Sequence, residues 1–155
     1  MALDPPSSAE AGDPRAHRGR CHCGALSFTF WTARPLRPRA CQCSFCRKHS
    51  ARTVSDAEGK ATIHLAVPLD SAAYRFASRQ ADYLVCPGCG VYIGALIPTP
   101  GGSFATLNLN AFEKPHPELA AEPVSYDAQS AEEKLARRMG MWTPTTVVGP
   151  ASGAG

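Results

Sequence analysis

The chain contains 155 residues, of which 44% are hydrophobic and 19% are charged, and it carries a formal net charge of +3. This composition is typical of one globular domain that can bury its own core. Because no apolar run approaches the ~20 residues that cross a bilayer, the sequence excludes a membrane-spanning helix.

The two ends of the chain differ in composition from the rest. Residues 1–16 contain prolines, serines and early acidic residues but lack the apolar segment of a secretory signal. We therefore expect 1–16 to be a disordered leader, 17–148 to form one domain, and 149–155 to be a flexible tail.

The first half of the domain is predicted to form short strands. The segment GALSFTFW (24–31) alternates, which places Leu26, Phe28 and Phe30 on one face of a half-buried strand. A short strand is expected before the next cysteines, and SFCRKHS (44–50) could hold one helical turn. Further β-like segments follow at 61–67, 72–78 and 82–86.

The second half holds the strongest strand predictions and one helix. The segments VYIGALI (91–97) and SFATLNLNAF (103–112) flank the turn PTPGG and predict a hairpin. Three prolines indicate an irregular loop after it. Ser130 and Glu133 then form a capping box, and the helix is expected to end at Gly140. The chain should therefore be a mainly-β single domain with a short C-terminal helix.

Two cysteine pairs have the spacing of a closed metal site. The turn CPGCG carries Cys86 and Cys89, and its glycines allow the positive φ that lets both thiolates face one side. The segment CHCG carries Cys21 and Cys23, which point the same way on an extended strand. Together these four thiolates would make a tetrahedral structural zinc site. A redox C-x-x-C is the alternative, but no thioredoxin-like βαβ pattern surrounds this one.

Three further cysteines, Cys41, Cys43 and Cys46, supply three ligands and leave one position open. Three protein ligands with an exchangeable fourth position are typical of a catalytic zinc. The alternative is a second structural site that His49 closes. We expect water or a substrate sulfur in the fourth position instead, because so short a reach from Cys46 to His49 strains the chain.

The seven cysteines, in a chain without a recognisable signal, indicate a reducing, cytoplasmic location. Thiols there bind metals or do chemistry rather than pair as disulfides. Two zinc ions, one structural and one catalytic, are therefore the expected cofactors.

The order of the three motifs C-x-C-G, C-x-C-x-x-C-R-K and C-P-x-C-G resembles the glutathione-dependent formaldehyde-activating enzyme family, which also includes centromere protein V. The motifs lie between about Gly19 and Gly94. The resemblance implies a small, zinc-stabilised β-sheet fold with the two ligand sets described above. The chain departs from the family pattern after Lys48, where His49, Ser50 and Ala51 follow.

An open three-thiolate zinc suits the binding of a fourth sulfur. An incoming thiol would lose its proton there and attack an aldehyde to give a hemithioacetal, and the reverse reaction would cleave the carbon–sulfur bond. The sequence thus predicts a carbon–sulfur lyase that acts reversibly on an adduct of an aldehyde with glutathione or a similar thiol, as the resemblance also implies.

Four residues around the open site are candidates for its chemistry. Cys43 is a catalytic candidate as a ligand of the reactive zinc, and His49 is one as a general acid–base whose usual pKa is near working pH. Arg47 and Lys48 are candidates for binding the carboxylates of a glutathione-like thiol.

Two other functions stay open. The same zinc site could act on a larger thioether or electrophile in a specialised pathway. A non-catalytic zinc module could instead bind nucleic acid or protein through the nine basic residues that lie between Pro14 and Ser55. We do not expect a nucleic-acid partner, because aromatic residues are not interleaved with these cations. Seven thiolates with two zinc ions would also bring the formal net charge to zero.

Overall fold

The computed structural model describes residues 14–150 of the protein. Residues 1–13 of the expected leader and residues 151–155 of the expected tail lie outside the described residues. Arg15 and Ala16, which we also assigned to the leader, belong to the first strand.

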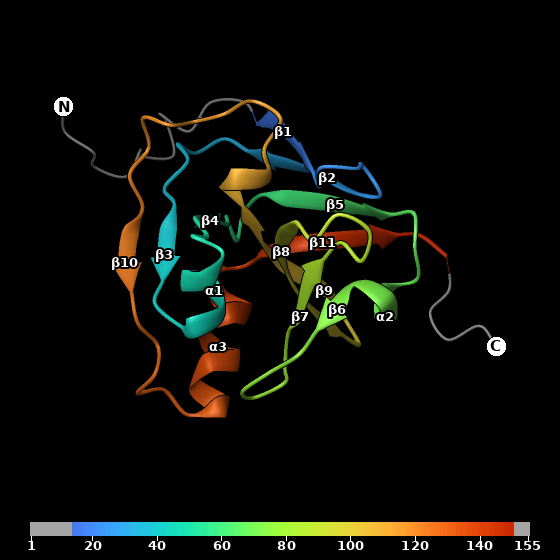
Figure 1. Ribbon diagram of the computed structural model, residues 1–155. Coiled ribbons are helices and arrows are strands. Elements are labelled where there is room, and N and C mark those ends of the chain that lie inside the picture. Colours follow the sequence, from blue (N-terminus) through green and yellow to red (C-terminus); the bar gives the residue numbers. More distant parts are fainter. Residues whose placement is uncertain (1–13, 151–155) are drawn as a thin grey trace.

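The fold is mainly β, as predicted, and ends with a short helix followed by a strand (Figure 1). Its helices are α1 (Ser44–Lys48), α2 (Leu69–Ala72), a short 3-10 turn η1 (Leu109–Ala111) and α3 (Ala131–Met141). Its strands are β1 (Arg15–Arg20), β2 (Leu26–Thr32), β3 (Arg39–Cys41), β4 (Thr53–Val54), β5 (Lys60–Leu65), β6 (Ala73–Tyr74), β7 (Asp82–Val85), β8 (Tyr92–Thr99), β9 (Gly102–Asn108), β10 (Glu122–Val124) and β11 (Thr143–Val148).

Strand β9 is the branch point of the sheet. On one edge it pairs antiparallel with β8, which confirms the predicted hairpin. On the other edge it pairs first with β11 and then with β4. The chain of strands β1-β2-β5-β11 therefore continues through β9 to β4, β3 and β10, while β8, β7 and β6 form a second arm.

Strand β8 separates two hydrophobic clusters. Ile93 and Leu96 belong to the main core, which also contains the predicted strand face Leu26, Phe28 and Phe30. The opposite side of β8 contributes to a smaller cluster, and its members include Cys46, Tyr83, Tyr92, Ala95, Ile97 and Trp142. Burial on both faces explains why the segment around β8 reads as a nearly continuous apolar run.

Several elements differ from the sequence prediction. The segment 72–78 forms only the short strand β6, because Ala77 and Arg79 take positive φ and end extended pairing. The loop predicted as irregular contains β10, an edge strand in which Pro123 is tolerated. The strands β1, β4 and β11 were not predicted, and neither was the helix α2.

Helix α3 begins as predicted and ends one residue later than predicted. Ser130 Oγ accepts from the Glu133 N–H at 3.1 Å, and Glu133 Oε1 accepts from the Ser130 N–H at 2.8 Å. Gly140 does not terminate the helix, because it does not take the left-handed conformation of a C-terminal glycine. Trp142 follows directly and leads into β11.

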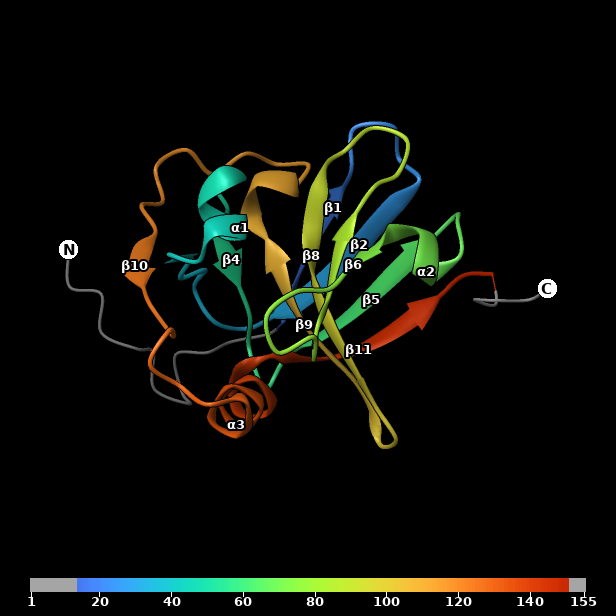
Figure 2. The same cartoon turned by 60° about the horizontal axis from the view of Figure 1, so that its bottom comes forward.

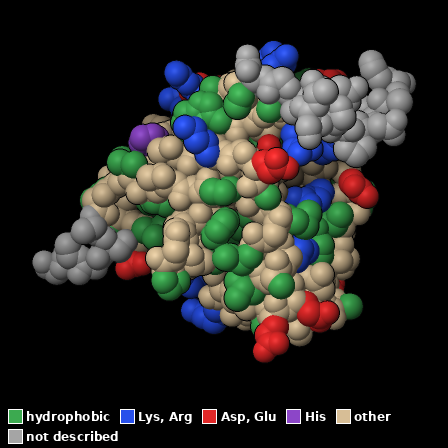
Figure 3. All heavy atoms as spheres, turned by 180° about the vertical axis from the view of Figure 1, so that it is seen from behind, with side chains coloured by type: hydrophobic (Ala, Val, Ile, Leu, Met, Phe, Trp, Pro, Cys, Tyr) green, Lys and Arg blue, Asp and Glu red, His purple; other side chains and the backbone are tan. Residues whose placement is uncertain are grey.

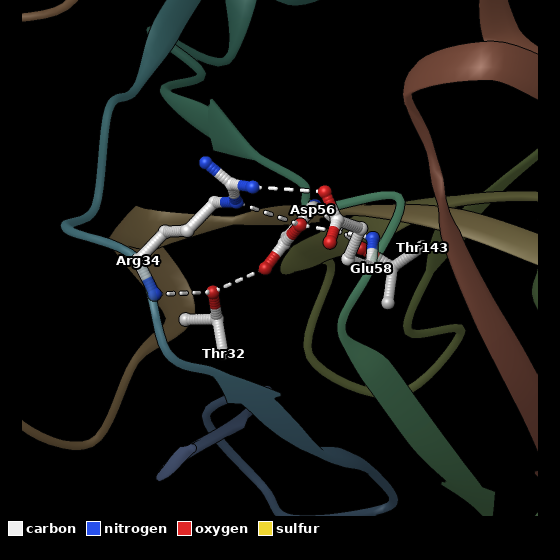
Figure 4. Close-up of polar contacts among 5 residues, drawn as sticks. All are labelled: Thr32, Arg34, Asp56, Glu58 and Thr143. Carbon is white, nitrogen blue, oxygen red and sulfur yellow. Dashed lines mark hydrogen bonds and ion pairs between the residues drawn. The ribbon is translucent and has the colours of Figure 1, made fainter. Parts of the chain in front are cut away.

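A cluster of polar contacts around Asp56 lies at the point where α3 passes into β11 (Figure 4). Asp56 accepts from Thr32 Oγ1 at 2.6 Å, and the Asp56 N–H donates to Thr143 Oγ1 at 2.8 Å. Arg34 and Glu58 complete the cluster through Asp56 Oδ1. These contacts join the end of β2, the segment after β4 and the start of β11, so they set the position of α3.

The Thr143 contact can be tested by removing one hydroxyl. Thr143→Val keeps the side-chain shape but leaves the Asp56 N–H without this acceptor. We expect the free energy of unfolding to fall by about 1–3 kcal/mol in urea denaturation. Thr29→Val, on the partly exposed face of β2, should change it by less than about 0.5 kcal/mol. Equal effects of the two substitutions would contradict the proposed anchoring role.

Candidate metal centres and active site

The first cysteine group joins two loops that are far apart in the sequence. Cys21 and Cys23 lie between β1 and β2, whereas Cys86 and Cys89 lie between β7 and β8. All four sulfurs lie within 4.8 Å of one another, with Cys21–Cys23 at 3.8 Å and Cys23–Cys86 at 3.5 Å. Sulfurs at two corners of a tetrahedron with 2.3 Å metal bonds are about 3.8 Å apart. The group therefore has the dimensions of a four-thiolate metal site.

Backbone N–H groups favour negative charge on two of these sulfurs, those of Cys21 and Cys89. The turn glycine Gly90 takes a φ of +80°, and Gly24 takes +85° after the first pair. The Leu26 N–H donates to Cys21 Sγ at 3.3 Å. The N–H groups of Cys23 and Val91 lower the pKa of Cys89 to about 6. A thiolate is the form that binds a metal.

The second group contains three sulfurs on one short segment. Cys41 ends β3, Cys43 is the N-cap of α1, and Cys46 lies one turn into that helix. The Cys46 N–H donates to Cys43 Sγ at 3.4 Å. Hydrogen bonds from Cys41 and Cys46 hold the pKa of Cys43 far below its usual value. This group can hold a metal through three ligands, and among residues 14–150 no fourth cysteine, histidine or carboxylate lies within the same 4.8 Å distance of all three sulfurs.

His49 lies beside this group without joining it. It caps the C-terminus of α1, and its ring packs against Phe45 and Tyr92 at centroid distances of 4.5 Å and 5.5 Å. Arg47 and Lys48 are exposed, and Arg47 Nε donates to the carbonyl of Gln42 at 3.0 Å. None of these three predicted site residues lines the cavity next to the sulfurs.

The three-cysteine group forms part of the wall of a cavity of about 130 Å³. The sheet contributes Tyr83 and Tyr92 to its lining, and Trp142 closes it at the start of β11. Four cationic side chains also line it, one from β3 and three from α3: Arg39, Lys134, Arg137 and Arg138. Figure 2, in which α3 is seen end-on, shows that helix apart from α1, so residues distant in the sequence line the cavity.

The two tyrosines are buried and keep their hydroxyl protons, so they can serve as hydrogen-bond donors. Burial raises the pKa of Tyr83 to about 12, and it raises the pKa of Tyr92 well above its usual value. Arg138 Nη2 donates to the Tyr83 hydroxyl at 3.4 Å. Both hydroxyls therefore stay protonated at neutral pH and can donate to an oxygen atom in the cavity.

Sequence reasoning missed these tyrosines and the cations of α3. The predicted strands contained Tyr83 and Tyr92, but the pairing that brings them beside the cysteines depends on contacts over long sequence distances. The cations of α3 could have been predicted to lie together, because i, i+3 and i+4 spacing places Lys134, Arg137 and Arg138 on one helix face.

The basic stretch between Pro14 and Ser55 is largely engaged within the chain. Arg34 pairs with Glu58 at 2.8 Å, and Arg20 with Glu113 at 3.8 Å. Arg52 donates to the carbonyls of His116 and Leu119. On the face seen in Figure 3, basic and acidic side chains are interspersed. No helix within the described part of the chain is long and apolar enough to span a membrane.

The raised pKa of Tyr83 predicts a pH dependence of stability. The unfolded chain ionises this tyrosine near pH 10, whereas the folded protein holds the proton until about pH 12. Its contribution to stability is therefore full below about pH 10 and is lost as the pH rises toward 12. In urea denaturation over this range, the free energy of unfolding of Tyr83→Phe should fall less steeply than that of the parent. Equal slopes would show that Tyr83 is not buried as described.

Two comparisons place the chain among known proteins. The model of the glutathione-dependent formaldehyde-activating enzyme family matches residues 16–128. The chain is also similar to the crystal structure of a Rhodobacter sphaeroides protein, a Northeast Structural Genomics target. The two are 25% identical, and the match covers 70% of this chain and 99% of that one, with a TM-score of 0.46. The family match extends over more than half of the sequence and contains all seven cysteines, so the chain belongs to the glutathione-dependent formaldehyde-activating enzyme family.

Proposed function

We propose that the protein is a zinc-dependent carbon–sulfur lyase that acts reversibly on the adduct of an aldehyde with glutathione or a similar thiol. The observation that carries this proposal is the placement of three cysteine sulfurs in the wall of a cavity, without a fourth protein donor among the described residues. A closed four-cysteine group lies elsewhere in the same domain. Membership of the family supports the connection with glutathione.

The two cysteine groups would have different tasks. Cys21, Cys23, Cys86 and Cys89 would hold a structural zinc that ties the β1–β2 loop to the β7–β8 loop. Cys41, Cys43 and Cys46 would hold the second zinc, which would lower the pKa of an incoming thiol when bound there. The size and shape of the sulfur groups fit this division.

The reaction needs a proton at the aldehyde oxygen. In the forward direction the thiol releases its proton to solvent, a sulfur–carbon bond forms, the carbonyl π electrons move to oxygen, and that oxygen takes up one proton from solvent in place of the one released. The reverse direction breaks the same sulfur–carbon bond and returns the proton. Tyr83 and Tyr92 line the cavity as protonated hydroxyls, so we propose that they donate hydrogen bonds to this oxygen and stabilise its developing charge.

A second candidate keeps the site and changes the substrate to a larger thioether or electrophile. It is favoured by the aromatic lining contributed by Phe76 and Trp142, which adds apolar surface to the cavity beyond the cysteine group. Incubating the zinc-loaded protein with pairs of thiols and aldehydes of increasing size, followed by NMR, distinguishes the two. Exchange of a hemithioacetal signal with a small aldehyde favours the first function.

Replacing a single cysteine in each group tests the proposed division. Cys43→Ser should keep the fold, because serine can still cap the Cys46 N–H, and it should retain one tightly held zinc ion of the parent's two. Turnover of the adduct, followed by NMR, should fall below detection. Cys86→Ser should instead destabilise or unfold the protein, because structural zinc binding is coupled to folding.

The outcomes that contradict this division are specific. Metal analysis that gives one ion in the parent protein, or seven titratable thiols in folded protein, would exclude two metal sites. A Cys43→Ser variant with full turnover would exclude the open site as the reactive one. If neither protein acts on any adduct and both bind nucleic acid equally, the protein is a binding module.

His49→Ala tests the acid–base assignment made from the sequence. Because the His49 ring packs on Phe45 and Tyr92 and does not line the cavity, we expect the variant to keep both zinc ions and to lose less than about tenfold in kcat. A loss of about 10²- to 10⁴-fold would instead support His49 as the general acid–base. Loss of the more labile zinc would mean that His49 closes the shell and that the open-site proposal is wrong.

A further inference from the structure

Arg138 is a buried cation that lacks a carboxylate partner. Its side chain is on α3 and the residue is 9% exposed. Its two hydrogen bonds run to neutral groups, Gln80 Oε1 and the Tyr83 hydroxyl, and both measure 3.4 Å. Its Nε is buried without any partner, and no acidic residue among 14–150 forms an ion pair with it. Its guanidinium also lies over the Trp142 ring, 5.4 Å from the centroid. The charge still lacks an anionic partner, although buried charges are normally paired.

The cavity that Arg138 lines has an excess of positive charge. Arg39, Lys134 and Arg137 add three more cations, whereas Asp127 is the only acidic residue of the lining. A zinc ion on three thiolates would contribute a net charge of about −1. Four cations against these two negative charges leave an excess of about two positive charges. The metal centre therefore does not neutralise the cavity by itself.

Helix α3 brings three of these four cations, and it lies outside the region that the family model matches. That region ends at residue 128, whereas α3 spans Ala131–Met141. Hydrogen bonds and packing hold the helix in place, beginning at its N-terminus, where Gln80 Nε2 donates to the Ala131 carbonyl at 2.9 Å. Arg137 stacks on the Tyr126 ring at 3.3 Å and donates to Gln129, and the buried Thr143 anchors the following strand to Asp56. The three cations of α3 are therefore held in fixed positions in the lining of the cavity, and they lie outside the residues that the family model matches.

We propose that α3 makes the cavity selective for a substrate that carries a carboxylate, with Arg138 as the principal anion-binding residue and Lys134 as a second contact. This inference names the substrate class of the proposed lyase. It rests on the proposed function only for the identity of the reacting group, and not for the binding of the carboxylate. A carboxylate can accept two parallel hydrogen bonds from a guanidinium, and the two Nη atoms of Arg138 are engaged here only by contacts of 3.4 Å to neutral groups. The carboxylate can belong to the thiol or to the aldehyde half of the adduct.

Equilibrium binding with unreactive ligands tests the proposal without any chemistry. N-acetyl-S-methylglutathione and its dimethyl ester, which carries no charge, represent the thiol half, while glycolate and glycolamide represent the aldehyde half. With the zinc-loaded full chain in calorimetry, at least one acid should bind about tenfold or more tightly than its neutral counterpart, as expected for a hydrogen bond to a charged group. The acid that shows this preference identifies the half that carries the carboxylate.

Variants separate anion binding from a structural role of Arg138. Arg138→Met should abolish the preference for the acid while leaving the affinity for the neutral ligand unchanged, and Arg138→Lys should restore part of it. Lys134→Gln, at a partly exposed position, should weaken the binding of the acid by a smaller factor of about threefold. It provides a test if Arg138→Met fails to fold. Arg18→Met, on the exposed face of β1, is the matched control and should change the affinity for neither ligand.

The inference is wrong if both acids bind no more tightly than their neutral counterparts. It is also wrong if Arg138→Met and Lys134→Gln bind the acid with the affinity of the parent, or if they weaken the binding of the acid and of its neutral counterpart equally. Because the probes cannot react, charge-selective binding without turnover of any adduct would support this inference while contradicting the lyase function. Turnover of an adduct without charge-selective binding would support the lyase function while contradicting this inference.

Discussion

The grouping of cysteine sulfurs is the constraint on which the structure depends. Four sulfurs within 4.8 Å join the loop that carries Cys21 and Cys23 to the loop that carries Cys86 and Cys89. If two of them were thiolates without a cation, they would repel one another by about 4 kcal/mol at 4 Å and an effective dielectric constant of 20. A bound metal ion would turn this repulsion into an attraction that holds the two loops together, so we expect metal binding and folding to be one process.

The second cysteine group depends on the same sheet but opens onto a cavity. Strand β8 buries one face in the main core and directs Tyr92 and Ala95 toward Cys46 on the other. This arrangement places protonated hydroxyls and three sulfurs around one cavity. Helix α3, fixed through Thr143, then closes the cavity with cations. In the proposed function, one cysteine group stabilises the domain, and the other is free for chemistry.

Much of this arrangement could be read from the sequence, because its signals are local. The spacing of the cysteines predicted both cysteine groups, and the alternation around Phe28 predicted β2. The capping pair Ser130 and Glu133 predicted the start of α3. The strands β1, β10 and β11 could not be predicted, since their charged or proline-containing segments become strands only by pairing with distant partners. The cavity lining was missed for the same reason: Tyr83 and Arg138 are 55 residues apart and meet only in the folded chain.

X-ray absorption at the zinc edge tests the central claim, that one site is closed by cysteines and the other is open, most directly. Four sulfurs at one site and three at the other predict an average of about 3.5 sulfurs per zinc ion, with bond lengths near 2.3 Å. Adding glutathione should raise the average to about four as a thiolate enters the open position. An average of four before any thiol is added, or a persistent imidazole contribution that glutathione does not displace, would contradict the open site.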